Sequence, residues 1–444
     1  MPPAVTNLVF EVIPHFEGYA YPNEATSQPL WGILIVLYPY ITGLVAGAFI
    51  MASLVRVFKV RALEPVYRLS MLTAFAFLLC APLPLLFHLG HPERCLEVMM
   101  TPHLTSPMAI FGFIYAWYLM AVLLLELWFD YRADFVAWSE ITPGFRGMLY
   151  RLFTVGVTDV SAPAVELDHK IGQVLSIVGI PSAFLLHGYV GFIFGSIKAN
   201  PWWGNVLMPI IFIMSAMVSG IALCVFNYMV LSWVRRKAID MKCLDTMCMF
   251  LFYSLVMDAA IEGLDWIHRI YSAEEGFQVI QYMAREKLFY TLSLGQVAMG
   301  TLMPLLLLGS LQLIRRRVPE LPRRRMYFAS SALILVGVLA MRWNVVIGGQ
   351  TFSKSLRGIM TYKMEFAGLE GWLMGAFLLI LPFIVLTVFI KLFLSEKLLS
   401  TVPLQTLSAQ PPRNAFGPAA FDDDFAVPSS SGSDETDSQL KHKN

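Results

Sequence analysis

Long apolar runs separated by short polar segments dominate the pattern of this chain. A helix that crosses the hydrocarbon core of a membrane needs about 20 apolar residues, and nine runs reach that length. We place them at 31–55, 67–89, 107–129, 171–197, 204–234, 243–268, 288–314, 326–343 and 371–395. The pattern therefore predicts an all-α integral membrane protein with nine transmembrane helices.

The amino-acid composition also indicates a membrane protein and excludes several kinds of partner. Of the 444 residues, 57% are hydrophobic and only 14% are charged, which is not typical of a soluble protein of this length. The formal net charge is +1, and the basic residues gather at the junctions between apolar runs, so membrane lipid is the expected surrounding and nucleic acid is not a partner. The five cysteines form no CxxC pair, so we expect neither an iron–sulfur cluster nor a zinc site in this chain.

The distribution of Lys and Arg predicts how the chain is oriented. The segments 56–66, 130–170, 235–242 and 315–325 together hold 17 basic residues, and the segments on the opposite side hold nine. Because basic residues are enriched in cytoplasmic loops, we expect a multi-pass protein of a bacterial or archaeal cytoplasmic (inner) membrane, with the N-terminus outside and the C-terminus inside. The 342–366 segment carries four of the nine basic residues on the outer side, and protein contacts are expected to hold some of them.

The two ends of the chain differ from the apolar middle. We expect a periplasmic N-terminal segment at 1–30, a transmembrane domain at 31–396 and a cytoplasmic tail at 397–444. From about residue 399 the tail is rich in Pro, Ser, Gly and Asp, a composition that cannot bury a core, so we expect it to be disordered.

The sixth apolar run carries an unusual set of charged residues. Asp258, Glu262, Asp265 and Arg269 follow one another at spacings of four, three and four, which places them on one face of a helix. Ionisable groups within a membrane-crossing helix usually face the bundle interior and mark a proton or substrate route. We predict proton exchange for Asp258, Glu262 and Asp265. The alternative is an Asp265–Arg269 ion pair that ties down the end of the helix, and we accept anchoring for Arg269.

Other polar side chains are expected at the same level in the outer half of the membrane. Each alone is more often a satisfied interior group, but their common depth favours a binding site. The expected cofactor-binding residues are Tyr38, His88, His91, His187, His268, Arg342 and Asn344. Nearer the cytoplasmic side, Glu126, Asp130, Asn227 and Asp245 begin a proton path or else are interfacial residues.

Haem b is the obvious alternative use of membrane histidines. It needs two imidazoles that face each other across a bundle, and His88 with His187 is the one plausible pair. Neither lies within a small-residue and basic pattern that would seat the haem propionates. We therefore expect no haem and no metal site.

Three segments carry a resemblance to a known family. Trp31-Gly32, Tyr38 and the run 43–48 resemble the opening helix of the NrfD/PsrC family of quinone-interacting membrane subunits. The segment 88–94, followed by Thr105-Ser106-Pro107-Met108, is similar to the family's Leu-Gly-Arg-Pro segment and its Ser-Pro-Met helix start, with His91 in place of the usual arginine. The segment 342–350 resembles the DsrP branch of the family.

The resemblance implies more than the residues alone do. It implies two four-helix bundles, formed by spans two to five and six to nine, with the first helix packed beside them. It also implies a pocket for menaquinone or ubiquinone near the periplasmic face. The implied partners are a ferredoxin-like iron–sulfur subunit (DsrO-like) and the cytochrome c and cytochrome b/iron–sulfur subunits of a DsrMKJ-like module.

Our leading interpretation is a membrane subunit of a sulfur-metabolism redox complex that oxidises or reduces quinone, with or without proton translocation. It would act as a quinone oxidoreductase only within the multisubunit complex. Because quinone chemistry moves protons together with electrons, titratable groups are needed at the pocket. The alternatives are a secondary transporter, whose site would lie at helices broken by Pro181 or Pro209, and a purely structural membrane anchor.

Overall fold

The computed structural model describes residues 10–12, 31–101, 103, 105–272, 276–351, 358–360 and 362–394. The predicted tail at 397–444 and nearly all of the predicted N-terminal segment at 1–30 lie outside these residues. Within the described residues, nine helices are long and apolar enough to cross a membrane. They are Ile33–Arg56, Arg61–His88, Pro107–Ile141, Ala162–Gly195, Met208–Val234, Met241–Ser272, Phe289–Arg317, Glu320–Gly348 and Trp372–Phe393.

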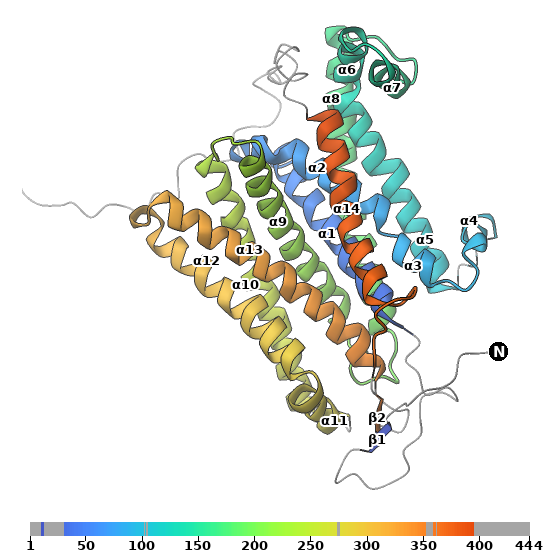
Figure 1. Ribbon diagram of the computed structural model, residues 1–444, viewed down its shortest axis with the longest axis vertical. Coiled ribbons are helices and arrows are strands. Elements are labelled where there is room, and N and C mark those ends of the chain that lie inside the picture. Colours follow the sequence, from blue (N-terminus) through green and yellow to red (C-terminus); the bar gives the residue numbers. More distant parts are fainter. Residues whose placement is uncertain are drawn as a thin grey trace, which may run out of the picture. The chain divides into compact units, whose positions relative to one another are not determined.

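Several of these spans consist of more than one element (Figure 1). The elements of the spans are α1 (Ile33–Arg56), η1 (Arg61–Leu63), α2 (Glu64–Cys80), α3 (Leu83–His88), α5 (Pro107–Ala116), η3 (Trp117–Leu124), α6 (Leu125–Ile141), α8 (Ala162–Gly195), α9 (Met208–Val234), α10 (Met241–Ser272), η5 (Phe289–Leu302), α12 (Met303–Ile314), η6 (Arg315–Arg317), α13 (Glu320–Trp343), η7 (Asn344–Gly348) and α14 (Trp372–Phe393). Between them lie the short elements η2 (Pro92–Arg94), α4 (Glu97–Met100), α7 (Phe145–Phe153), α11 (Phe277–Tyr282) and η4 (Met283–Lys287). Strands β1 (Phe10–Val12) and β2 (Gly358–Met360) pair antiparallel, with Phe10 opposite Met360.

An apolar run in lipid must satisfy its backbone hydrogen bonds internally, and therefore it folds as a helix. The all-α class and the nine spans predicted from the sequence are confirmed for the part of the chain that the structure describes. The third and fourth spans are longer than predicted, because they run to Ile141 and begin at Ala162. Their extra turns keep charged residues inside helices, where Arg132 and Asp168 form a buried ion pair at 2.5 Å.

The position of α1 differs from the one that the resemblance implied. It does not lie beside two bundles. It is the most enclosed of the spans, with 89% of its most apolar stretch buried, and it packs mainly along α9, α2 and α8. The small residues Gly43, Ala46 and Gly47 allow neighbouring helices to approach closely.

The grouping of the other spans differs too. Helix α9 packs on α10 and α13, and α13 packs on η5 and α12, so spans five to eight form one group. The ninth span, α14, packs on α2 and α1 instead of joining spans six to eight (Figure 1). Its apolar surface, which includes Phe383 and Phe389, fits the phenylalanines Phe75 and Phe77 of α2, with ring centroids 5.2–5.5 Å apart.

Two glycine pairs set the closest helix crossings. A Cβ atom on Gly47 of α1 or on Gly220 of α9 would collide with the backbone of the other helix. The same is true of Gly300 in η5 and Gly337 in α13. These crossings hold α1 against α9 and η5 against α13.

Two terms describe position along the bundle. The side of the membrane at which α1 begins is called the Trp31 end, and the side at which α1 finishes is called the Arg56 end. Because successive spans alternate in direction, α10 begins at the Arg56 end and finishes at the Trp31 end.

Candidate functional site

Helix α10 carries the three carboxylates that the sequence singled out. Asp258 and Asp265 are 5% and 8% exposed, and Glu262 is half-buried between them. At 1.5 Å per residue, Asp258 lies about 25 Å from Met241 and about 21 Å from Ser272, so it is near the middle of the helix. Glu262 and Asp265 lie one and two turns closer to the Trp31 end.

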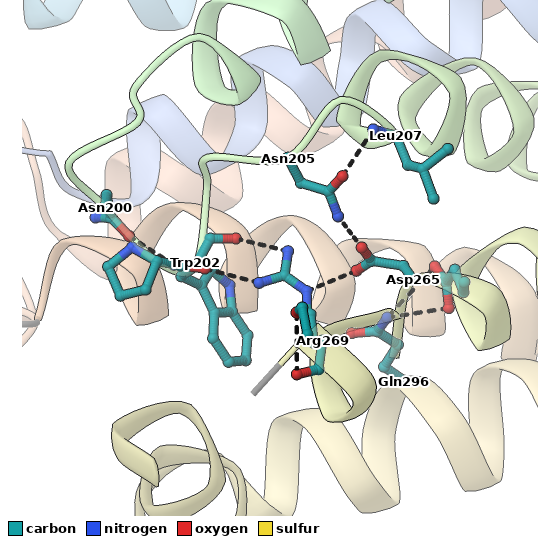
Figure 2. A network of polar contacts seen from close by, with 10 residues as sticks. Asn200, Trp202, Asn205, Leu207, Asp265, Arg269 and Gln296 are labelled. Atoms are coloured by element: carbon teal, nitrogen blue, oxygen red, sulfur yellow. Dashed lines mark hydrogen bonds and ion pairs between the residues drawn. The ribbon is translucent and has the colours of Figure 1, made fainter. Parts of the chain in front are cut away.

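Asp265 is fully occupied by neighbouring groups. Arg269 donates from Nε to Asp265 Oδ2 at 2.9 Å, and the amide of Asn205 donates to Oδ1 (Figure 2). Arg269 also donates to the backbone carbonyls of Pro201 and Trp202, at 2.7 and 3.2 Å. The pair therefore fixes the loop between α8 and α9 to the end of α10. This geometry favours the anchoring alternative for Asp265 over the proton exchange that we predicted.

Glu262 begins a row of side chains that crosses from α10 through η5 to η7. Gln296 Nε2 of η5 donates to the two Glu262 oxygens over long distances of 3.4 and 3.3 Å. The Gln296 carbonyl in turn accepts a hydrogen bond from Asn344 Nδ2 at 2.9 Å. Gln296 and Asn344 are 8% and 1% exposed, and Asn344 Oδ1 has no hydrogen-bond partner among the described residues.

Gln296 was not among the site residues predicted from the sequence. An uncharged amide in an apolar run is a weak signal, although its position in the span opposite α10 could have suggested a partner for Glu262. Both amides lie on widened helical turns, since η5 and η7 are π-helices. Turns of this kind occur often at functional sites.

Arg342 forms a second cluster deeper in the bundle. Its side chain is completely buried and donates from Nη2 to His187 Nε2 at 3.0 Å and to Ser215 Oγ at 2.6 Å. Its guanidinium carbon lies 4.0 Å from the ring centroid of Phe212. No salt bridge of Arg342 occurs among the described residues, which is unusual for a buried arginine.

The contact with Arg342 defines the protonation of His187. A guanidinium can only donate hydrogen bonds, so His187 Nε2 accepts the hydrogen bond from Arg342. The imidazole is then neutral, with its proton on Nδ1. That nitrogen is buried and has no hydrogen-bond partner in the described part of the chain. Asp258 Oδ1 is likewise buried and unpartnered within the described residues.

A pocket adjoins the row of amides. The pocket has a volume of about 60 Å³, which is room for a few water molecules. Its wall is mostly apolar and includes Met208, Ile211, Trp266 and Met341, with Glu262, Asp265, Arg269, Gln296 and Asn344 as the polar residues. A smaller cavity of about 10 Å³ lies along Ser215, Asp258, Glu262, Gln296 and Met341. Glu262 and Gln296 line both spaces, so they stand between the pocket and the middle of the membrane.

The remaining predicted site residues do not line this pocket. Tyr38 packs edge-on against Phe111, at 5.3 Å between ring centroids, and its hydroxyl has no partner in the described chain. His88 pairs with Glu370 at 2.5 Å. His91, which is exposed, contacts Glu93 at 3.0 Å, and His268 is exposed on another face of α10. The sequence predicted one binding site from the common depth of these residues. They do not share a site, because they point in different directions around the bundle.

Polar residues at the Arg56 end form ion pairs. Asp130 pairs with Arg56, and Asp134 pairs with Arg68 at 2.7 Å. Glu126, which is 1% exposed, accepts a hydrogen bond from Ser176. Asp245 accepts from Tyr327 at 3.0 Å and contacts Arg323 at 3.5 Å, and Asn227 donates to Thr73 at 3.4 Å. The side chain of Glu126 is therefore buried inside the protein.

No group of three or more His, Cys, Asp or Glu residues with the geometry of a metal site occurs in the described segments. The cysteines Cys80, Cys95, Cys224, Cys243 and Cys248 are free thiols, and all but Cys95 are buried.

These features define a multi-pass membrane protein with a polar network enclosed by its helices. Comparison with known proteins gives the family. The sequence model of "Polysulphide reductase, NrfD" matches residues 22–354, and the chain belongs to the NrfD family, as the first two of the three segments had indicated.

Individual relatives agree with this assignment. The chain is 31% identical over 334 residues to the C subunit of selenate reductase from Mesobacillus selenatarsenatis, with 73% of this chain and 75% of the relative covered. It is 26% identical over 196 residues to protein NrfD of Escherichia coli, with 44% and 58% covered. It is 23% identical over 268 residues to the Hdr-like menaquinol oxidoreductase integral membrane subunit of Archaeoglobus fulgidus, with 59% and 58% covered.

Proposed function

We propose that this chain is the quinone-reactive membrane subunit of a redox complex and that the pocket beside Glu262 receives the quinone head group. The single observation that carries the proposal is the row Glu262–Gln296–Asn344, which lines a mostly apolar pocket inside a membrane bundle. Pockets with apolar walls and a few convergent polar groups are typical ligand sites. The name of the archaeal relative, a menaquinol oxidoreductase subunit, supports the same class of ligand.

The residues at the pocket fit a quinone. Its carbonyl oxygens need hydrogen-bond donors, and Gln296 Nε2 is held only by the long contacts to Glu262, so the amide is available to turn toward a ligand. The unpartnered Asn344 Oδ1 suits a quinol hydroxyl. Met208 and Met341 line the wall, and their flexible side chains can make room for a ring larger than the present cavity.

A bound quinone would supply two-electron chemistry that is coupled to two protons. Glu262, at the wall of the pocket, exchanges a proton with the ligand oxygen, and Asp258, one turn deeper on the same helix, is the next proton carrier. Gln296 and Asn344 orient the head group. Arg342 provides a fixed positive charge in the low-dielectric interior, which stabilises negative charge on the two carboxylates.

The proposed function also includes the orientation of the chain in the membrane and its partner subunits. The excess of basic residues in the segments 56–66, 130–170, 235–242 and 315–325 supports a cytoplasmic Arg56 end. The pocket would then open near the periplasmic face of an inner membrane. There a ferredoxin-like iron–sulfur subunit would exchange electrons with the quinone. The likeness of the segment 342–350 to the DsrP branch supports a DsrMKJOP-like complex of sulfur metabolism.

A transporter is less well supported by the geometry. The sequence suggested broken helices at Pro181 and Pro209, but α8 continues through Pro181, and Pro209 lies in the first turn of α9. Proline is tolerated in a first turn because its missing N–H has no partner there. Neither proline opens a midplane site.

Purification of the native complex tests the proposal. We expect iron–sulfur subunits to co-purify and lipid extracts to contain quinone in a fixed ratio to this chain. The variant Met341→Trp, which fills the pocket, is expected to lower the quinone content. A complex that purifies without quinone and does not oxidise added quinol would refute the proposed function.

A further inference from the structure

Helix α7 (Phe145–Phe153) has an inner face that fits tightly against α6. Gly144 directly precedes the helix with a φ of 76°, a conformation that suits glycine, and a side chain at Gly147 would collide with the Thr142 carbonyl. Tyr150 is completely buried, with its ring 5.3 Å from that of Trp138. This face fixes the helix to the hairpin formed by α6 and α8.

The outer face of α7 is apolar and open. Phe145, Met148 and Leu152 are 81%, 71% and 70% exposed, and their spacings of three and four residues place them on one side of the helix. A helix on the surface of a water-soluble domain shows the opposite pattern, with polar residues outside. The exposed Arg151 lies at the flank of the apolar face.

Contacts with α14 (Trp372–Phe393) give the depth of α7 in the membrane. Arg146 Nη2 donates to the Lys391 carbonyl at 2.5 Å, and Tyr150 donates from its hydroxyl to the Leu392 carbonyl at 2.7 Å. With 22 residues, α14 is about 33 Å long, close to the hydrocarbon thickness of about 30 Å. Near its other end, Gly375 packs against Ile33 at the start of α1. Helix α7 therefore lies where α14 leaves the hydrocarbon.

We propose that α7 is an interfacial helix whose outer face, formed by Phe145, Met148 and Leu152, inserts into the membrane at the boundary between lipid headgroups and acyl chains. Amphipathic helices at this depth bury an apolar face and keep basic residues at the headgroup level. This lipid contact holds the α6–α8 hairpin, to which α7 is packed, against the bilayer.

Spin labels on the full-length protein test this placement. The background is Cys95→Ser, because the other four cysteines are buried. A nitroxide is attached at Met148→Cys and, as the matched control, at Glu140→Cys, an exposed position near the end of α6. The proteins are reconstituted in nanodiscs of phosphatidylethanolamine and phosphatidylglycerol. Relaxation by dissolved oxygen and by a water-soluble nickel chelate is then measured.

We expect the label at Met148 to be relaxed by oxygen and shielded from the chelate, and the label at Glu140 to show the reverse. Equal access of the chelate to both labels would overturn the proposal. Shielding of Met148 that occurs in the native complex but not in nanodiscs of this chain alone would also overturn it, because a protein subunit would then be the occupant. A failure of quinone binding leaves this result unaffected.

Discussion

Replacing Glu262 by glutamine removes the proton that the side chain exchanges in the proposed function and leaves its volume almost unchanged. The amide retains one oxygen that can accept from Gln296, whose contacts with the carboxylate are already long, at 3.3 and 3.4 Å. The stability lost through these contacts is therefore small, about 1 kcal/mol or less. General acid–base groups contribute about 10²- to 10⁴-fold to a rate, which is roughly 3 to 5 kcal/mol of barrier. We expect Glu262→Gln to lower quinol-linked electron transfer by this factor while the complex still assembles.

The assay is oxidation of a soluble quinol analogue by the purified complex, with subunit content and thermal unfolding measured on the same samples. Glu166→Gln is the matched control. Glu166 is exposed on α8 and pairs with Lys170 at 2.8 Å, and such surface pairs are worth less than about 1 kcal/mol. Asp258→Asn should follow Glu262→Gln. If both variants of α10 assemble normally and oxidise quinol at the wild-type rate, the carboxylates are structural and the pocket must be sought around Tyr38, His88 and His187.

Four further results are expected. Gly220→Leu should prevent the α1–α9 crossing and abolish assembly, whereas Gly263→Ala, which meets open space, should leave thermal unfolding unchanged or raise its midpoint. Arg132→Ala should lower stability by about 3 to 5 kcal/mol, because it leaves Asp168 buried without its partner, and unfolding in detergent measures this against Arg151→Ala on the surface. A reporter fused after the tail should be active in the cytoplasm, and periplasmic activity would mean a miscounted span. The chain expressed alone should show no haem Soret band and no iron, and a stoichiometric b-type spectrum would contradict this.

Much of the fold followed from the apolar pattern, because the length of a membrane-crossing helix is fixed by the bilayer. The pattern could not give the neighbours of each span. The faces of α1 are almost uniformly apolar, so its central position depends on small residues such as Gly47, which pack against one particular partner. The third and fourth spans were cut short in the prediction, because Arg132 and Asp168 looked like loop residues until their pairing was seen.

The candidate site was only partly predictable for a related reason. Charge identified Glu262, Arg342 and Asp265, but only the packing of α9, η5 and α13 shows that they belong to different contacts. Depth along the helix can be counted from the sequence, whereas direction around the bundle cannot. His268 illustrates this limit, since it lies three residues from Asp265 and yet is exposed.

The widened turns of η5 and η7 have a consequence for how such a pocket can arise. Gln296 and Asn344, each on one of these π-helical segments, are joined by a hydrogen bond of 2.9 Å. A π-helical turn can arise from one residue inserted into an α-helix, and one inserted or deleted residue turns the side chains that follow it by about 100° around the helix. Insertions and deletions inside membrane helices, rather than substitutions alone, are thus a route by which relatives of this chain can gain or lose the site.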